Sequence, residues 1–289
     1  MTSTPPATIK LFLPFGDPTR LRTAELSNWS GKALAAPRSD LAELFERDEI
    51  EQSGVYVLTG VDSMKGDPVA YVGEAEVLRS RLKQHAAKDF WNQVLVFVSK
   101  DENLTKAHVR YLEGALILEA TTADRMRLLN AQASGSRLPE ADRADMDVYL
   151  SKVRQMLPVL GSPLLTPTPS RSEANPSPEF STSISGLTAS GRPTSGGFVV
   201  FEGSCAVRDH RPSASASVRA ERDRLLDEGD LAVENGHFIF TRDTEFSSPS
   251  MAASVVKGGN TNGLTNWKTS DGVSLKDLES RSTSGPGSE

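Results

Sequence analysis

Two polar side chains in the helix predicted at residues 76–87 fall on the face that should be buried. At ~100° per residue, Leu78 and Leu82 define the apolar stripe of this helix, and Arg81 and His85 lie within the same arc, one turn apart. A guanidinium in a buried stripe is costly unless an anion meets it. The spacing therefore indicates a partner for Arg81 beyond this helix.

A carboxylate occupies a comparable position in the long helix predicted at residues 105–121. Glu113 projects into the apolar arc of this helix, between Val109 and Ile117, and Leu112 and Leu116 extend the arc on the Val109 side. A carboxyl group there protonates, pairs with a cation or binds a metal ion, because burial disfavours its unpartnered charged form. The sequence alone leaves these three outcomes open.

Two tyrosines lie on strands that the sequence predicts to be neighbours. Residues 54–60 and 69–73 are β-branched runs joined by a polar turn, which is typical of a β-hairpin. Tyr56 stands in the first strand and Tyr71 in the second. Two phenols, a guanidinium, an imidazole and a carboxylate could therefore converge on one site built from the sheet and the helices.

Composition and periodicity divide the chain into segments. Further strands are predicted at residues 8–14 and 93–99, and a trailing helix at 139–157. A stretch rich in Ser, Thr and Pro cannot bury enough apolar surface to offset its ordering entropy. We expect an α+β fold arranged as an N-terminal extension (1–53), a first domain with its trailing helix (54–158), a flexible linker (159–197), a small separate α+β domain (198–279) and a disordered tail (280–289).

The charge of the chain limits how it can bind nucleic acid. The formal net charge of the 289 residues is −6, residues 54–130 carry ten basic and ten acidic side chains, and residues 198–289 carry ten and fourteen. This balance excludes a protein that coats nucleic acid by bulk charge. Binding would have to rest on a few placed cations.

Membrane and disulfide-rich classes are also disfavoured. No apolar run approaches the ~20 residues needed to cross a bilayer, and the first residues lack the pattern of a secretory signal. The single cysteine, Cys205, excludes an internal disulfide and a cysteine-rich zinc site, and it fits a reducing cytosol. We therefore expect a cytoplasmic protein without a membrane partner.

The ordered set of polar residues resembles the GIY-YIG nuclease family. The resemblance covers residues 54–130 and rests on six features in family order, which are Gly54-Val55-Tyr56, Tyr71-Val72-Gly73, Arg81, His85, Glu113 and Asn130. It implies a small three-stranded antiparallel sheet flanked by helices. It also implies hydrolysis of phosphodiester bonds with one weakly held Mg²⁺ or Mn²⁺, with DNA preferred to RNA as the substrate.

The resemblance also implies a role for each residue. Tyr56 would be the general base or would orient the attacking water, and Tyr71 would position the phosphate or share in proton transfer. Arg81 would neutralise charge on the phosphoryl oxygens, and His85 would support Tyr56 or donate a proton. Glu113 would hold the metal. Asn130 would position the site, unless it is only the cap of a helix.

The C-terminal region resembles a second family, the uncharacterised DUF4357 type. The segments that carry this resemblance run from residue 197 to 279 and end in FSSPSMAASVVKGGNTNGLTNWK and GVSLKDL. The resemblance implies a recognition or docking role. The candidate nucleic-acid contacts, with two lysines near the first site, are Lys83, Lys88, Asn260, Asn262, Trp267 and Lys268, although Trp267 is equally suited to a core position.

Two functions fit these observations. The first is a metal-dependent endonuclease in bacterial or phage nucleic-acid processing, restriction or defence. The second is an inactive nucleic-acid-binding module or regulator on the same scaffold, and the neutral charge of residues 54–130 favours this alternative. One active site cuts one strand per event, so double-strand breaks would require a dimer or two encounters.

Overall fold

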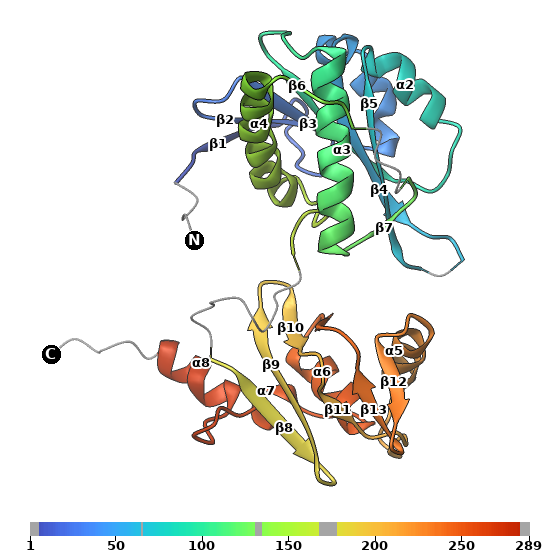
Figure 1. Cartoon of the computed structure of the whole chain (residues 1–289), viewed down its shortest axis with the longest axis vertical. Coiled ribbons are helices and arrows are strands. Elements are labelled where there is room, and N and C mark those ends of the chain that lie inside the picture. The colour runs from blue at the N-terminus through green and yellow to red at the C-terminus, as the bar shows by residue number, and fades with distance from the viewer. Residues whose placement is uncertain (1–5, 65, 131–134, 168–177, 284–289) are drawn as a thin grey trace, which may run out of the picture. The chain divides into compact units, whose positions relative to one another are not determined.

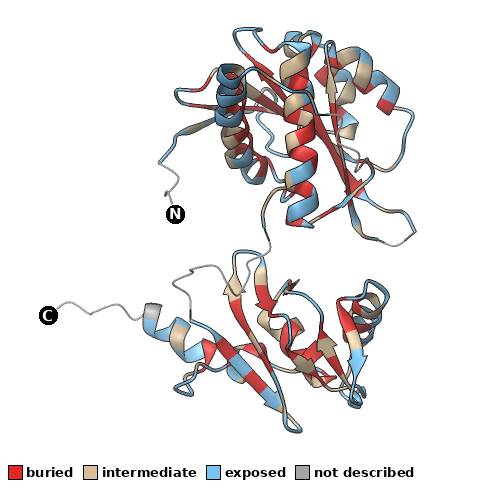
Figure 2. Ribbon diagram, in the orientation of Figure 1, coloured by how far each residue is buried: buried red, intermediate tan, exposed pale blue. Residues whose placement is uncertain are grey.

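The computed structural model describes residues 6–64, 66–130, 135–167 and 178–283 and divides the chain into two compact units, which are residues 1–167 and 168–289 (Figure 1). Buried residues form a core within each unit (Figure 2). Within the described ranges, no helix combines the length and the apolar composition that crossing a bilayer requires. The two units are considered separately below.

Unit 1 is built on a seven-stranded sheet with the order β1-β2-β3-β6-β4-β5-β7. Every neighbouring pair is antiparallel except β5 and β7, which are parallel. The strands are β1 (Ile9–Phe12), β2 (Arg22–Leu26), β3 (Gly31–Pro37), β4 (Gly54–Val61), β5 (Pro68–Ala75), β6 (Gln93–Ser99) and β7 (Arg127–Leu128).

Helices cover both faces of this sheet. Residues on alternate positions of β4 enter two different cores: Val55 and Val57 pack with α3 and α4, whereas Tyr56 and Leu58 pack with α1 and α2. Coverage on both faces explains why β4 reads as a continuous apolar run. The helices are α1 (Leu41–Phe45), α2 (Leu78–His85), α3 (Lys106–Ala123) and α4 (Glu140–Val159), and two 3₁₀ turns lie at Arg38–Asp40 and Asp48–Glu51.

The expectation of a three-stranded sheet preceded by an N-terminal extension at 1–53 is wrong. Strand β3 pairs with β6 along its whole length, from Gly31 opposite Ser99 to Pro37 opposite Gln93. Leu34 and the neighbouring alanines of β3 are fully buried. Alanine has a low strand propensity, so the GKALAAP segment gave no strand signal.

Unit 2 is an α+β domain with two small sheets. A four-stranded sheet has the order β14-β10-β9-β8, and a three-stranded sheet has the order β11-β13-β12. Its elements are β8 (Phe180–Ile184), β9 (Leu187–Thr194), β10 (Gly197–Val200), β11 (Cys205–Ala206), α5 (Ala216–Asp227), β12 (Leu231–Glu234), β13 (His237–Phe240), β14 (Thr244–Phe246), α6 (Pro249–Lys257), α7 (Gly263–Asn266) and α8 (Leu275–Thr283). Asn235 and Gly236 form the turn between β12 and β13, with φ of 47° and 83°, which is typical of an Asn-Gly hairpin turn.

The expected linker at 159–197 and tail at 280–289 also need correction. Residues 168–177 lie outside the described residues, but β8 and β9 fall within the expected linker. The buried positions of β8 are Phe180 and Thr182. Because one of them is a threonine, the segment has the polar composition of a linker, and the sequence did not indicate a strand there. Leu160 and Leu164 belong to the core of unit 1. Helix α8 continues to Thr283, and the rest of the tail lies outside the described residues.

The integration of residues 1–53 gives a first testable prediction. Leu34→Ala should destabilise unit 1 by about 2–5 kcal/mol, because Leu34 of β3 is fully buried and its shorter replacement leaves a cavity in the core. Chemical denaturation measures this free energy of unfolding. Leu11→Ala is the matched control, because Leu11 of β1 is 45% exposed and should tolerate the change. Equal, negligible effects of the two substitutions would mean that the N-terminal strands are not part of the core.

Candidate functional site

Strands β4 and β5 place Tyr56 against a glycine. Tyr56 is paired with Gly73 across the two strands, and Leu58 is paired with Tyr71, so both tyrosines project from the same face. A Cβ atom at residue 73 would lie 2.3 Å from the Tyr56 hydroxyl oxygen. The absence of a side chain at Gly73 therefore makes room for the phenol, which is completely buried.

Helix α2 completes a hydrogen-bonded cluster on this face. The Tyr56 hydroxyl lies 2.9 Å from Nε2 of His85, and Arg81 donates from Nε to the same hydroxyl at 3.2 Å. Arg81 also donates from Nη2 to the Tyr71 hydroxyl at 3.4 Å. Because a guanidinium can only donate, the Tyr56 oxygen accepts from Arg81, and its own proton is available to His85.

The predicted arc of α2 is confirmed. Leu78, Leu82 and His85 are buried, and Arg81 is half-buried at the margin. Within the described part of the chain, Arg81 bonds to two phenols and to Oε1 of Gln84 at 3.1 Å, and no carboxylate lies within 4.0 Å. The anion expected for this guanidinium is therefore not supplied by a described residue.

The aromatic rings of the cluster pack closely. The rings of Tyr56 and Tyr71 stack with centroids 6.2 Å apart, and the His85 ring lies 4.7 Å from that of Tyr71. The ammonium of Lys88 lies 5.5 Å from the centroid of the Tyr71 ring. Tyr71 is half-buried and stacks on the fully buried Tyr56, so its ring extends from the buried cluster to the protein surface. The cluster is therefore buried at Tyr56 and accessible at its margin through Tyr71 and Arg81.

Burial dominates the protonation of this cluster. Burial raises the pKa of the Tyr56 hydroxyl well above its usual value and outweighs the opposing effect of Arg81. Burial, followed by the charges of Lys88 and Arg81, lowers the pKa of His85 to about 4. At neutral pH the site therefore holds a protonated phenol beside a neutral imidazole, which is able to accept a proton.

Glu113 belongs to α3, the helix that packs on the opposite face of the sheet from α2, and its side chain is half-buried. Its charge contributes to the raised pKa of Tyr56 and, after burial, to the raised pKa of Glu74. Glu74 follows Gly73 on β5, and its Oε1 lies 4.0 Å from Nε of Arg110. Sequence reasoning missed Glu74, although strand alternation places it on the α3 side.

The carboxylates of Glu113 and Glu74 repel each other, and a divalent cation bound between them would relieve this repulsion. Their chemistry is therefore compatible with such an ion. No group of three or more His, Cys, Asp or Glu side chains suited to a metal occurs among the described residues. Waters and substrate oxygens would therefore have to supply most of the ligands of an ion held by Glu113.

Asn130 clamps the edge of β5. Its Oδ1 accepts from the Val72 amide at 3.1 Å, and its Nδ2 donates to the Val72 carbonyl at 2.5 Å. It does not cap a helix, because α3 ends at Ala123 with Asp124 in the left-handed conformation. Asn130 therefore fixes the backbone between Tyr71 and Gly73.

The proposed nucleic-acid contacts differ in accessibility. Trp267 is wrong as an exposed contact: it is fully buried, stacks on Phe198 with centroids 4.4 Å apart and donates to the Pro249 carbonyl. An indole whose N–H has a backbone acceptor suits a core position. Trp267 is therefore a core residue, which is the alternative that the sequence left open for it. The exposed candidates are Lys83, Lys88, Asn260, Asn262 and Lys268.

Two of these exposed residues already have local roles. Oδ1 of Asn260 accepts from the Ser215 amide at 3.3 Å, and Oδ1 of Asn262 accepts from the Leu264 amide at 3.0 Å as the cap of α7. The side chains therefore order turns of unit 2.

Comparison with known proteins assigns only the C-terminal unit. Residues 180–279 match the family model described as a domain of unknown function, DUF4357. The match confirms the resemblance noted for this region and begins at β8 rather than at residue 198. No curated protein and no solved structure matches the chain.

The depressed pKa of His85 gives a second prediction. Between pH 6.5 and about 4 the unfolded state binds a proton that the folded state rejects, so stability should fall as the pH falls through this window. His85→Gln should flatten this part of the stability curve, and denaturant midpoints at a series of pH values would show it. If the denaturant midpoints of the parent and of His85→Gln changed in parallel between pH 6.5 and 4, His85 would not be a neutral imidazole in the folded protein.

Proposed function

We propose that residues 54–130 form an endonuclease site that hydrolyses phosphodiester bonds in nucleic acid, DNA in preference to RNA, with one Mg²⁺ or Mn²⁺. The observation that carries the proposal is the hydrogen-bonded chain from Arg81 through Tyr56 to His85. A buried phenol between a guanidinium and a neutral imidazole is costly to assemble, and it contains the groups that activation of water next to a phosphate requires.

Proton transfer in this site would pass through both rings. As water attacks the phosphorus, the bond from phosphorus to the leaving ester oxygen would break, and the leaving alkoxide would take a proton from solvent. One proton of the attacking water would move to the Tyr56 oxygen while the Tyr56 proton moves to Nε2 of His85. This concerted path avoids a free phenolate, which the raised pKa of Tyr56 disfavours. His85 is neutral at pH 7 and so has a free site for the proton, while its pKa of about 4 means that it would pass this proton on to solvent after each turnover.

Substrate would have to displace Arg81 from the phenols. The two bonds from Arg81 to the tyrosines, at 3.2 and 3.4 Å, are at the long end of the range for N–H···O bonds, so they are weak. A bidentate bond from the guanidinium to a phosphate, in which both partners are charged, is shorter and stronger than a single bond to a neutral phenol. Movement of Arg81 to the phosphate would expose the Tyr56 oxygen to water.

The carboxylates of Glu113 and Glu74 would hold the divalent cation. When bound, this ion would stabilise the negative charge that develops on the phosphoryl oxygens. Asn130, through its two bonds to Val72, would keep Tyr71 and Gly73 in register with Tyr56.

One observation favours the second candidate function, a binding module or regulator without turnover. Tyr56 is completely buried and its pKa is raised, so a protein in which Arg81 never leaves the phenols would bind phosphate without cutting. Cleavage of supercoiled plasmid with Mg²⁺ or Mn²⁺ separates the two functions, with RNA tested in parallel.

The nuclease proposal predicts that Tyr56→Phe lowers the rate of plasmid nicking about 10²–10⁴-fold, because it removes the transferred proton without removing the ring. Glu113→Gln should cause a comparable loss. Tyr111→Phe is the matched control, because its hydroxyl contacts Asp147 rather than the cluster. Tyr56→Phe and Tyr111→Phe proteins that nick at the parental rate would rule out this role for Tyr56.

A further inference from the structure

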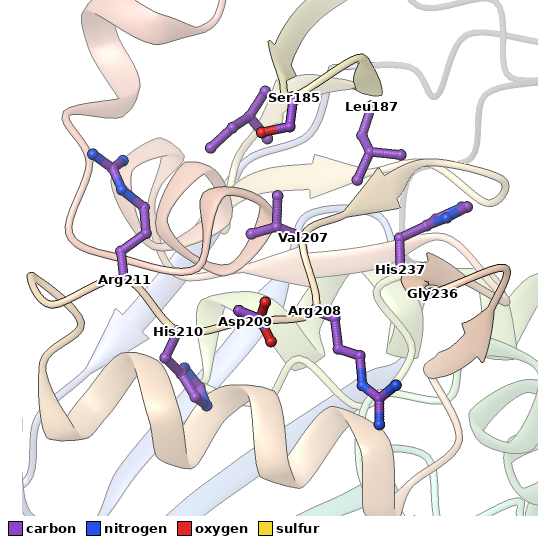
Figure 3. Close-up of a pocket in the computed structure, with 10 residues that line it drawn as sticks. Ser185, Leu187, Val207, Arg208, Asp209, His210, Arg211, Gly236 and His237 are labelled. Carbon is purple, nitrogen blue, oxygen red and sulfur yellow. The ribbon is translucent and has the colours of Figure 1, made fainter.

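A pocket of about 460 Å³ lies in unit 2, and its lining includes none of the residues that the sequence singled out there (Figure 3). Three segments line it: the turn between β8 and β9 at Ser185, the loop at residues 207–211, and the start of β13 at His237. Its size is within the range of small-ligand sites. Nothing in the matched family description assigns a role to it.

A buried arginine holds the 207–211 loop in place. Arg222 of α5 is only 1% exposed, and its guanidinium donates to the carbonyls of Val207, Arg208 (3.0 Å) and Asp209 (3.4 Å). The loop is anchored on its other side by the Arg211 amide, which donates to the Gly258 carbonyl at 2.6 Å. The loop backbone is therefore preorganised, with its carbonyls directed at Arg222.

The pocket has an excess of positive donors. The guanidinium groups of Arg208 and Arg211 have no carboxylate within 4.0 Å among the described residues. By contrast, Arg224 in the same unit pairs with both Glu221 and Glu228. In a chain of net charge −6, two exposed arginines left unpaired on one rigid loop indicate an external anion. Asp209 is the only acidic residue that lines the pocket.

The arrangement of the two arginines selects among anions. Arg208 and Arg211 extend from the loop in different directions, with the other lining residues between them (Figure 3). Two diverging guanidiniums do not close on one small anion, but they can contact separate phosphates of a polymer. Leu187, Val207 and the His237 ring add an apolar surface on which a base can rest.

We propose that this pocket binds the phosphate backbone of nucleic acid, with Arg208 and Arg211 contacting separate phosphates. The proposal shares with the proposed nuclease function the choice of nucleic acid as the ligand, but it concerns a different site. Arginine suits this role because its planar fork matches phosphate oxygens. The pocket would hold the polymer without taking part in cleavage.

The test is equilibrium binding of the full-length protein to fluorescent single-stranded and duplex oligonucleotides in EDTA, where metal-dependent cleavage cannot contribute. Arg208→Gln/Arg211→Gln should raise the Kd about tenfold and reduce the slope of log Kd against log salt concentration by roughly 2, because two phosphate contacts are lost. Both side chains are exposed, so the unfolding midpoint should not change.

The control is Lys276→Gln/Arg281→Gln, which removes the same charge from exposed positions of α8 outside the pocket. It should leave the Kd within about twofold of the parent, since surface charges remote from the ligand are screened. Equal weakening by both double variants, or none by Arg208→Gln/Arg211→Gln, would overturn the proposal. Displacement of the oligonucleotide by inorganic phosphate or a mononucleotide at similar concentrations would assign the pocket to a free phosphate ester and would also overturn it.

The binding assay tests the pocket proposal and the nicking assay tests the nuclease proposal, so either proposal can fail without the other. If Arg208→Gln/Arg211→Gln weakens binding but the parent never nicks plasmid, the pocket stands and the nuclease proposal falls. If the parent nicks plasmid but the double variant binds as the parent does, the nuclease proposal stands and the pocket assignment falls.

Discussion

A phenol that has no contact with solvent must satisfy its hydroxyl inside the protein, and in unit 1 Tyr56 does so between Arg81 and His85. This constraint accounts for the surrounding residues. Gly73 has to be a glycine because the phenol occupies the space of its side chain. Leu78 and Leu82 anchor α2 so that its two polar residues reach the hydroxyl. The same burial keeps His85 neutral.

Much of the fold was predictable wherever a strong periodic or turn signal existed. Strand β6 has the predicted bounds of 93–99, because its apolar run is bordered by polar residues. Strand β3 was not predictable, because its alanines are buried by pairing with β6, whose residues lie between 56 (Pro37 to Gln93) and 68 (Gly31 to Ser99) positions further along the sequence. Strand β8 was hidden because its inward threonine resembles linker composition.

The site residues that carry a local signal in the sequence could be predicted, and those that depend on tertiary packing could not. Arg81 and His85 were found because they violate the apolar stripe of their own helix, a local signal. Glu74 was missed because its proximity to Glu113 arises only when α3 packs on the sheet. Base catalysis by Tyr56 requires either a lowered pKa or a concerted transfer of its proton. Burial raises the pKa of the hydroxyl, which favours the concerted transfer.

The central claim is that His85 accepts the proton that Tyr56 releases during phosphodiester hydrolysis. The most direct measurement is the single-turnover rate of DNA cleavage as a function of pH at saturating Mg²⁺ or Mn²⁺. Since the pKa of His85 is about 4, the rate should hold its neutral value well below pH 6.5 and fall only as the pH approaches 4. An acid limb centred near the ordinary imidazole pKa of about 6.5 would contradict the claim.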